Sequence, residues 1–163
     1  IRRPPRSSPK PSSAASDVNK RQVEEYLSLE NGLSTISTVQ VDGKILSSVV
    51  NCGLIPHPID SSPCVAFVSG GSAARLKHIA RGSEITVSVR RGWKWVAVSG
   101  KGSLYGPRTL SEDSDDEYLR LLLRDVFIAA GGTHENFDEY DQVMATERRV
   151  VVCISIDRII GNT

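Results

Sequence analysis

Apolar and polar residues alternate along several short stretches of the chain, and this alternation is typical of half-buried β-strands. Residues 33–41 alternate in this way and are rich in β-branched side chains, and residues 45–52 form a second such stretch. Between them lies Asp42-Gly43, a strong signal for a two-residue hairpin turn. The pattern therefore predicts an antiparallel hairpin early in the folded chain.

Four further strands are predicted from runs of apolar and β-branched residues, at 64–68, 84–89, 95–104 and 149–156. A turn is expected at 90–92, between the second and third of these strands. Residues 53–63 contain three prolines and His57, so we expect an exposed surface loop there, with His57 solvent-exposed or gating.

Helical periodicity predicts four helices. The first spans 17–29, with Asp17 as its N-cap and Asn31-Gly32 at its end. A short basic helix is expected at 73–81, and a longer amphipathic one at 116–130 that ends at Gly131-Gly132. A last short helix is expected at 136–144.

These elements together predict an antiparallel α+β barrel that is mainly β, with five or six strands and peripheral helices. No strand–helix–strand rhythm runs through the chain, which disfavours a doubly wound sheet. We expect one domain at 17–163, preceded at 1–16 by a disordered basic tail rich in proline and serine. A nucleic-acid-binding role for this tail is a remote alternative to a solvated tail.

Charge and cysteine content narrow the class of protein. The 20 basic and 19 acidic residues nearly balance, which argues against a nucleic-acid or membrane binder. No apolar run is long enough to span a membrane and no secretory signal is visible, so the expectation is a cytoplasmic protein. The three cysteines are far apart in apolar runs, which favours buried thiols over disulfides or a metal site.

The strongest candidate for chemistry is the Gly/Ser-rich turn at 69–72, which leads into the basic helix. Backbone N–H groups at such a turn and the side chains of Arg75 and Lys77 would favour an anion. The alternative is an ordinary turn followed by a solvated helix face. Two residues apart on a helix, Arg75 and Lys77 do not share a face, so one of them would bind the anion while the other pairs with a partner subunit or faces water.

Other chemistry finds little support in the sequence. The three histidines lack metal-ligand spacing, and no Gly-x-Ser-x-Gly elbow or Ser, His and acid arrangement stands out. Trp93 and Trp95 are expected on the same side of a sheet, in core or dimer packing or against a ligand ring.

The order of elements resembles the pyridoxamine-phosphate-oxidase-like split β-barrels. The residues that carry the resemblance are the hairpin at 42–44, the strand and basic helix at 65–81, and Trp-Val-Ala-Val-Ser-Gly-Lys-Gly-Ser-Leu at 95–104. Ala-Ala-Gly-Gly-Thr-His-Glu-Asn-Phe-Asp-Glu-Tyr at 129–140, with Glu-Arg-Arg at 147–149, is similar to the subgroup that uses the deazaflavin coenzyme F420. The resemblance covers residues 23–161.

This resemblance implies an FMN-binding-type split barrel that forms a homodimer, with cofactors in grooves between the subunits. Carried onto this chain, it implies that one strand lines the cofactor, that the turn and helix hold its phosphate or carboxylates, and that an aromatic residue packs near its ring. The strand residues are Ser47, Val49 and Asn51, and the aromatic residue is Trp95. The residues of the turn and helix are Ser69, Ser72, Arg75 and Lys77.

The implied activity is hydride transfer from reduced coenzyme F420 to a small, planar, unsaturated substrate. The sequence departs from the subgroup at Asn136 and Phe137, where aspartate and tryptophan are usual, and it has Arg75 where many relatives have lysine. Two alternatives stay open: an FMN-dependent oxidoreductase of the same fold, and a non-catalytic flavin- or deazaflavin-binding protein. Tyr140 and His134 are candidate proton donors.

Overall fold

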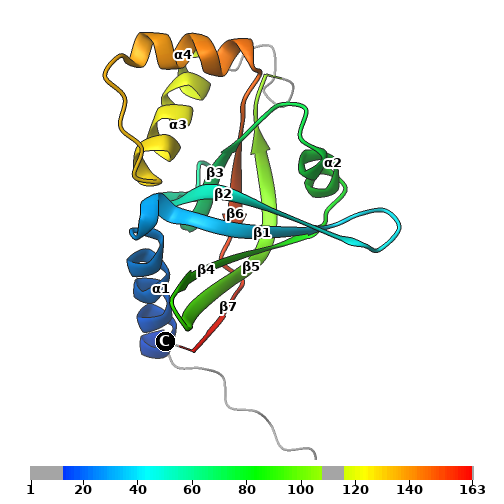
Figure 1. Ribbon diagram of the computed structural model, residues 1–163, viewed down its shortest axis with the longest axis vertical. Coiled ribbons are helices and arrows are strands. Elements are labelled where there is room, and N and C mark those ends of the chain that lie inside the picture. The colour runs from blue at the N-terminus through cyan, green and yellow to red at the C-terminus, as the bar shows by residue number, and fades with distance from the viewer. Residues whose placement is uncertain (1–12, 108–115, 163) are drawn as a thin grey trace, which may run out of the picture.

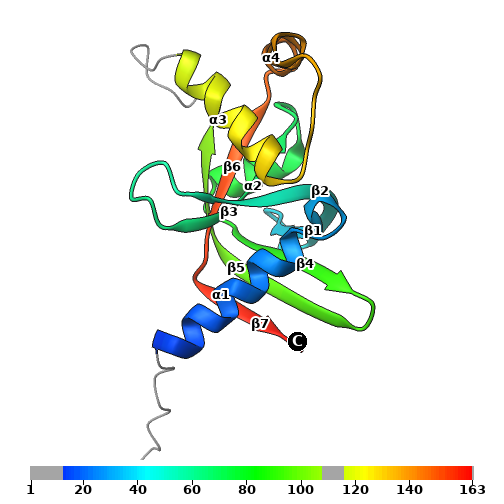
Figure 2. The same cartoon turned by 90° about the vertical axis from the view of Figure 1, so that its left-hand side faces the viewer.

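The structure, a computed structural model, describes residues 13–107 and 116–162 (Figures 1 and 2). Its helices are α1 (Ser13–Leu27), the 3₁₀ turn η1 (Glu30–Gly32), α2 (Ala74–Ala80), α3 (Asp116–Ala129) and α4 (Phe137–Thr146). Its strands are β1 (Leu33–Val39), β2 (Ile45–Pro56), β3 (Pro63–Ser69), β4 (Glu84–Arg91), β5 (Lys94–Tyr105), β6 (Val150–Ser155) and β7 (Arg158–Gly161).

The strands form an antiparallel sheet in the order β4-β1-β2-β3-β6-β5-β7, and pairing between β4 and β5 closes the first six into a barrel. The two long strands, β2 and β5, each change pairing partners halfway along, which splits the barrel into two parts. The first half of β2 pairs with β1 and its second half with β3. The first half of β5 pairs with β4 and β7, and its second half with β6. The fold is thus α+β, mainly β: a split antiparallel barrel with peripheral helices, as predicted.

Two apolar clusters hold the barrel together. The first fills the interior, where Phe67, Ile85 and Ile154 are fully buried and Val23 of α1 closes one end. The second lies on the outer face of β3 and β6, where Leu123 and Val126 of α3 pack. Because both faces of β3 and β6 are covered, these strands are apolar at almost every position instead of alternating.

Several predicted boundaries are wrong. Helix α1 begins at Ser13, so Asp17 lies inside it instead of capping it, and it ends at Leu27. The remaining residues of the predicted tail, 1–12, lie outside the described residues. The hairpin after β1 has a longer turn than the two residues expected, because Val39 pairs with Ile45 and the Gln40 N–H donates to the Lys44 carbonyl at 2.8 Å.

Other differences arise from long-range pairing. Residues 53–56 belong to β2 and not to a loop, because they pair with β3. The sequence pattern missed β7, a short strand that is held by pairing with β5. Trp93 lies in the β4–β5 turn, 95% exposed, and so does not share a sheet face with Trp95.

The three cysteines are buried free thiols, as expected. Within the described ranges, no helix combines the length and apolar character that crossing a membrane requires.

Candidate functional site

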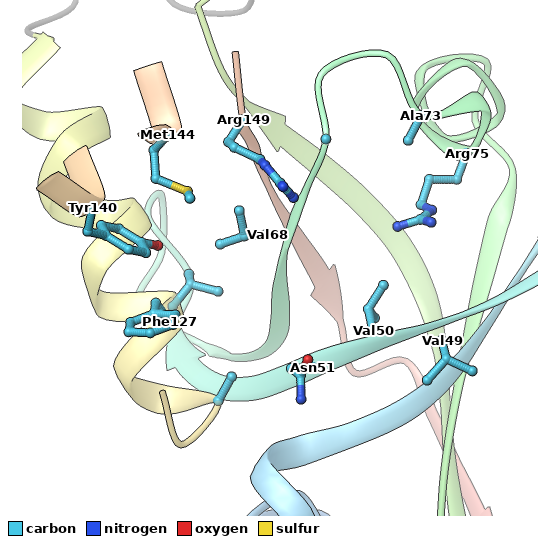
Figure 3. Close-up of a pocket in the computed structure, with 13 residues that line it drawn as sticks. Val49, Val50, Asn51, Val68, Ala73, Arg75, Phe127, Tyr140, Met144 and Arg149 are labelled. Carbon is cyan, nitrogen blue, oxygen red and sulfur yellow. The ribbon is translucent and has the colours of Figure 1, made fainter. Parts of the chain in front are cut away.

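A cavity of about 420 Å³ lies where β2, α3, α4, the turn before α2 and the start of β6 meet (Figure 3). Its volume is in the range of small-molecule sites. Most of its wall is apolar, with Val49 and Val50 of β2 at the bottom of Figure 3 and Val68 of β3 behind. The charged groups that line it are Arg75 of α2 and Arg149, which precedes β6.

Close backbone packing brings these distant segments together. A side-chain carbon at Gly71 would lie 2.3 Å from the Arg148 carbonyl oxygen, so only glycine lets the turn before α2 rest against the turn before β6. Strand register supports the same contact, because Ser69, the last residue of β3, pairs with Val150, the first of β6. As a result, Arg75 and Arg149 border one cavity.

Helix α2 is itself anchored by a buried histidine. His78 is buried, and its Nδ1 lies 2.9 Å from Oγ1 of Thr38, a buried residue of β1. This hydrogen bond orients the short helix on the barrel, which directs Arg75 toward the cavity. His78 is therefore a structural residue at the back of the site.

The wall from α3 depends on Gly53 of β2. A side-chain carbon there would lie 2.4 Å from the carbonyl carbon of Ala129, so the glycine allows α3 to approach the strand closely. This approach brings Val126, Phe127 and Ala130 to the cavity. Ion pairs between α3 and α4 fix the second helix, since Arg120 and Arg124 both bind Asp141.

Aromatic side chains form the wall beside α3 and α4. The rings of Phe127 and Tyr140 lie 4.7 Å apart between centroids, and both line the cavity. The Tyr140 hydroxyl donates to the Leu123 carbonyl at 3.1 Å, and burial raises the pKa of Tyr140 to about 12. Because its proton is held within the protein and is retained at neutral pH, Tyr140 supplies a ring face and not an acid.

His134, the other candidate proton donor, lies in the exposed loop before α4 and does not line the cavity. Its Nδ1 accepts the backbone N–H of Asn136 at 3.0 Å, and its ring stands 6.3 Å from that of Phe137. Asn136 in turn caps α4 by accepting the backbone N–H groups of Asp138 and Glu139. The Asn136 side chain therefore caps the start of α4. Asparagine caps a helix as well as aspartate, the residue usual in the F420 subgroup that the sequence resembles.

The two arginines differ in their surroundings. Arg75 makes no hydrogen bond or ion pair with any described residue, and burial lowers the pKa of its guanidinium, which still remains charged at neutral pH. The Nε of Arg149 donates to a carboxylate oxygen of Glu147 at 2.6 Å. Both guanidinium groups point into the cavity (Figure 3). A desolvated cation without a partner is costly, which favours an anionic ligand beside Arg75.

Three of the predicted site residues line this cavity: Val49, Asn51 and Arg75. Asn51 also donates through its amide to the Asn31 carbonyl at 2.9 Å. Ser72 and Lys77 border a second cavity of about 470 Å³ across the turn, so Arg75 and Lys77 face different spaces, as their spacing predicted.

The other three predicted residues lie elsewhere in the single chain. Ser47 is on the outer face of β2, bonded to Ser37 at 2.8 Å between hydroxyl oxygens. Ser69 is buried, and its hydroxyl donates to the Gly70 carbonyl at 3.4 Å. Trp95 lies close to the turn of the β4–β5 hairpin, next to β7. Sequence reasoning missed Phe127, Met144 and the role of Arg149, although Arg149 lay within a motif already singled out.

The fold also brings Ser103, His57 and Asp60 together, a serine, histidine and acid group that the sequence did not suggest. His57 has a side chain only 13% exposed, contrary to expectation, and its Nε2 lies 3.4 Å from the Ser103 hydroxyl. Its Nδ1 accepts the Ile59 N–H at 3.2 Å, so in the neutral ring the proton is on Nε2. That tautomer donates to serine and cannot deprotonate it, so the group caps a loop rather than forming a hydrolytic site.

No protein-family model matches the chain. Among solved structures, it is similar to the conserved hypothetical protein Rv2991 from Mycobacterium tuberculosis, with a TM-score of 0.62 and 12% identity over 87% of this chain and 82% of that one. HupZ from Group A Streptococcus gives a TM-score of 0.53 at 12% identity, covering 86% and 91%. An F420 reductase gives 0.52 at 12% identity, covering 78% and 88%. At these identities the likeness concerns the fold.

Proposed function

We propose that the protein is an oxidoreductase that binds coenzyme F420 in the cavity beside Arg75 and uses its reduced form to reduce a small unsaturated substrate. The observation that carries this proposal is Arg75, a partly buried guanidinium with no anionic partner among the described residues, at the rim of an apolar cavity. A flat ring with an anionic side chain matches that combination. The similarity of the fold to an F420 reductase supports the choice of cofactor.

In this proposal the chain's own residues bind and orient. Val49, Val50 and Asn51 would support the ring along β2, and Arg75, whose guanidinium can donate two hydrogen bonds to one anion, would hold the phosphate. Ser72 and Lys77, across the turn, would hold any part of the cofactor that continues into the second cavity. When bound, a reduced deazaflavin supplies a hydride, and the protein need only position it and exclude water.

A homodimer is part of the proposal. The outer face of the β1–β2 ribbon carries the exposed apolar side chains Leu33, Val39, Ile45 and Val49, the last of which also lines the cavity. An exposed apolar face of this kind marks an interaction surface. A second copy on this face would close the open side of the cavity and could bring its own Ser47 and Trp95 to the cofactor.

The test is a fluorescence titration of the purified protein with coenzyme F420 and, separately, with FMN. Preferential binding of F420, followed by oxidation of reduced F420 when unsaturated substrates are added, is the expected result. Preference for FMN would replace F420 by FMN in the same site, and F420 binding without turnover on any substrate class would indicate a carrier. Binding of neither would refute the proposal.

A further inference from the structure

We infer that the part of the cavity between α3, α4 and the start of β6 is a subsite for planar substrates that carry a carboxylate, and that Arg149 selects them. This inference rests on the proposed function, because it assigns the β2–α2 side of the same cavity to the cofactor. It goes further by naming a substrate class and the residue that discriminates it.

The charge of the cavity is the first argument. Its described lining contains two arginines and no aspartate or glutamate. The cofactor phosphate would pair with Arg75, which has no carboxylate partner among the described residues. Arg149 is bonded to Glu147, but Glu147 does not line the cavity, so the side-chain charge at the cavity wall is positive and favours a second anion beside Arg149. The second molecule that would enter the cavity is the substrate.

The donor geometry of Arg149 is the second argument. Its Nε and one terminal nitrogen are directed to Glu147, which occupies one edge of the guanidinium. The remaining donors of the planar group point into the cavity (Figure 3). The Arg149 side chain is 32% exposed and that of Glu147 is 48% exposed, so a dissolved anion can reach the pair. A substrate carboxylate would accept hydrogen bonds from the free edge while Glu147 keeps the arginine in place.

The opposite wall indicates the body of the substrate. Phe127, Tyr140 and Met144, which come from α3 and α4, line the cavity with two aromatic rings and a thioether (Figure 3). The Tyr140 hydroxyl proton is donated to the Leu123 carbonyl and so is not available to a ligand carboxylate. Such a wall stacks against a flat, conjugated molecule. The complement of this subsite is therefore an aromatic or conjugated carboxylate.

The competing assignment is that Arg149 binds a second anionic group of the cofactor. The two assignments differ in what an Arg149 variant loses. If Arg149 serves the substrate, removing its charge leaves cofactor affinity intact and removes the preference for an anionic substrate. If it serves the cofactor, Arg149→Gln weakens F420 as Arg75→Gln does.

The experiment is isothermal titration with trans-cinnamate and its neutral isostere trans-cinnamamide, using the protein alone and the protein saturated with F420. We expect the wild type to bind cinnamate at least tenfold more tightly than cinnamamide in both forms. Arg149→Gln should abolish this preference and change the F420 affinity less than twofold. Glu147→Gln should increase the preference, because it removes a negative charge that repels the substrate carboxylate while the amide oxygen can still accept from Arg149. This variant tests the idea even if Arg149→Gln folds poorly.

Equal binding of the two probes to the wild type would overturn the inference, and so would a loss of F420 affinity in Arg149→Gln that matches Arg75→Gln. Failure of F420 to bind the wild type would instead overturn the proposed function. The preference for cinnamate over cinnamamide in the protein alone would then still decide whether Arg149 forms an anion-selective subsite.

Discussion

The two halves of the barrel bury their outer faces in different ways. Around β3 and β6, helix α3 covers the outside of the sheet, and the strands are apolar on both faces. Around β1 and the first half of β2, buried and exposed residues alternate, and the outer side chains are exposed. Here Ile45 is 69% exposed and Val49 is 61% exposed, so a single chain leaves most of these two apolar side chains uncovered.

The covered half and the open half of the barrel are expected to contribute differently to folding and to assembly. The covered half buries both faces of its strands within one chain, whereas the open half buries only the inner face, which belongs to the barrel interior. The open half has apolar side chains that one chain does not bury, so its packing would be completed by a second copy or a ligand. The cavity lies at the junction, with an aromatic wall from the covered half and Val49 and Arg75 from the open half.

The largest expected effect is loss of packing in the covered half. Leu123 of α3 is 5% exposed, and Leu123→Ala should lower the free energy of unfolding by about 2–5 kcal/mol, because it leaves a cavity against the sheet. Leu121, on the same helix but 44% exposed, is the matched control, and its alanine variant should be nearly neutral. Urea denaturation measures both. Equal losses would show that α3 does not carry the packing assigned to it.

The open half should respond in assembly and not in stability. Ile45→Asp places a charge on the exposed ribbon face, and burial of an unpaired charge in a dimer should weaken self-association by about 3 kcal/mol. Ile128→Asp, at an exposed position on α3, should leave the dimer intact. Sedimentation velocity over a dilution series distinguishes them. A wild type that is monomeric at every concentration would refute the homodimer and leave the ribbon face for another partner.

A smaller effect is expected at the junction. Arg75→Gln should weaken F420 binding by about 1.5–3 kcal/mol, the range for a hydrogen bond to a charged group. Lys77→Gln, two residues away but facing the second cavity, should lose less. Titration of the cofactor fluorescence compares the two variants, and a larger loss at Lys77 would move the phosphate to the other side of the turn.

The smallest effect concerns the ion pairs that hold α4 to the covered half. Hydrogen bonding by Arg124, with a second bond from Arg120, holds the pKa of Asp141 below its usual range. A lowered folded-state pKa stabilises the protein above the unfolded pKa, and the contribution is lost as pH falls through the folded value. Asp141→Asn should therefore cost about 1 kcal/mol at neutral pH and flatten the loss of stability below about pH 4.

Asp138→Asn is the control for that experiment, since a carboxylate oxygen of Asp138 lies 3.8 Å from the Arg124 guanidinium but the Asp138 side chain is 94% exposed. Thermal unfolding followed at several pH values should show no change in its acid dependence. If Asp138→Asn and Asp141→Asn shift the acid limb equally, the carboxylates act through general surface charge and not through the specific pair.

Local features of the site were predictable from the sequence because they depend on neighbours in the chain. The period of α3, its end at Gly131 and the cap at Asn136 each arise from interactions within a few residues. Arg75 and Lys77 face different cavities because residues two apart on a helix point in different directions. The order of elements along the chain resembles that of the split barrels, and the observed sheet agrees with the fold that this resemblance implied.

Only the tertiary structure decided which distant residues meet. Arg149 joins Arg75 because β3 pairs with β6 in one register and Gly71 lets two turns touch, and neither contact leaves a trace in local periodicity. The same reason explains why β7, the extension of β2 and the burial of His57 were missed. Hydrophobic pattern determines which face of an element is buried. What that face is buried against depends on long-range pairing, and in this protein that pairing builds the cavity.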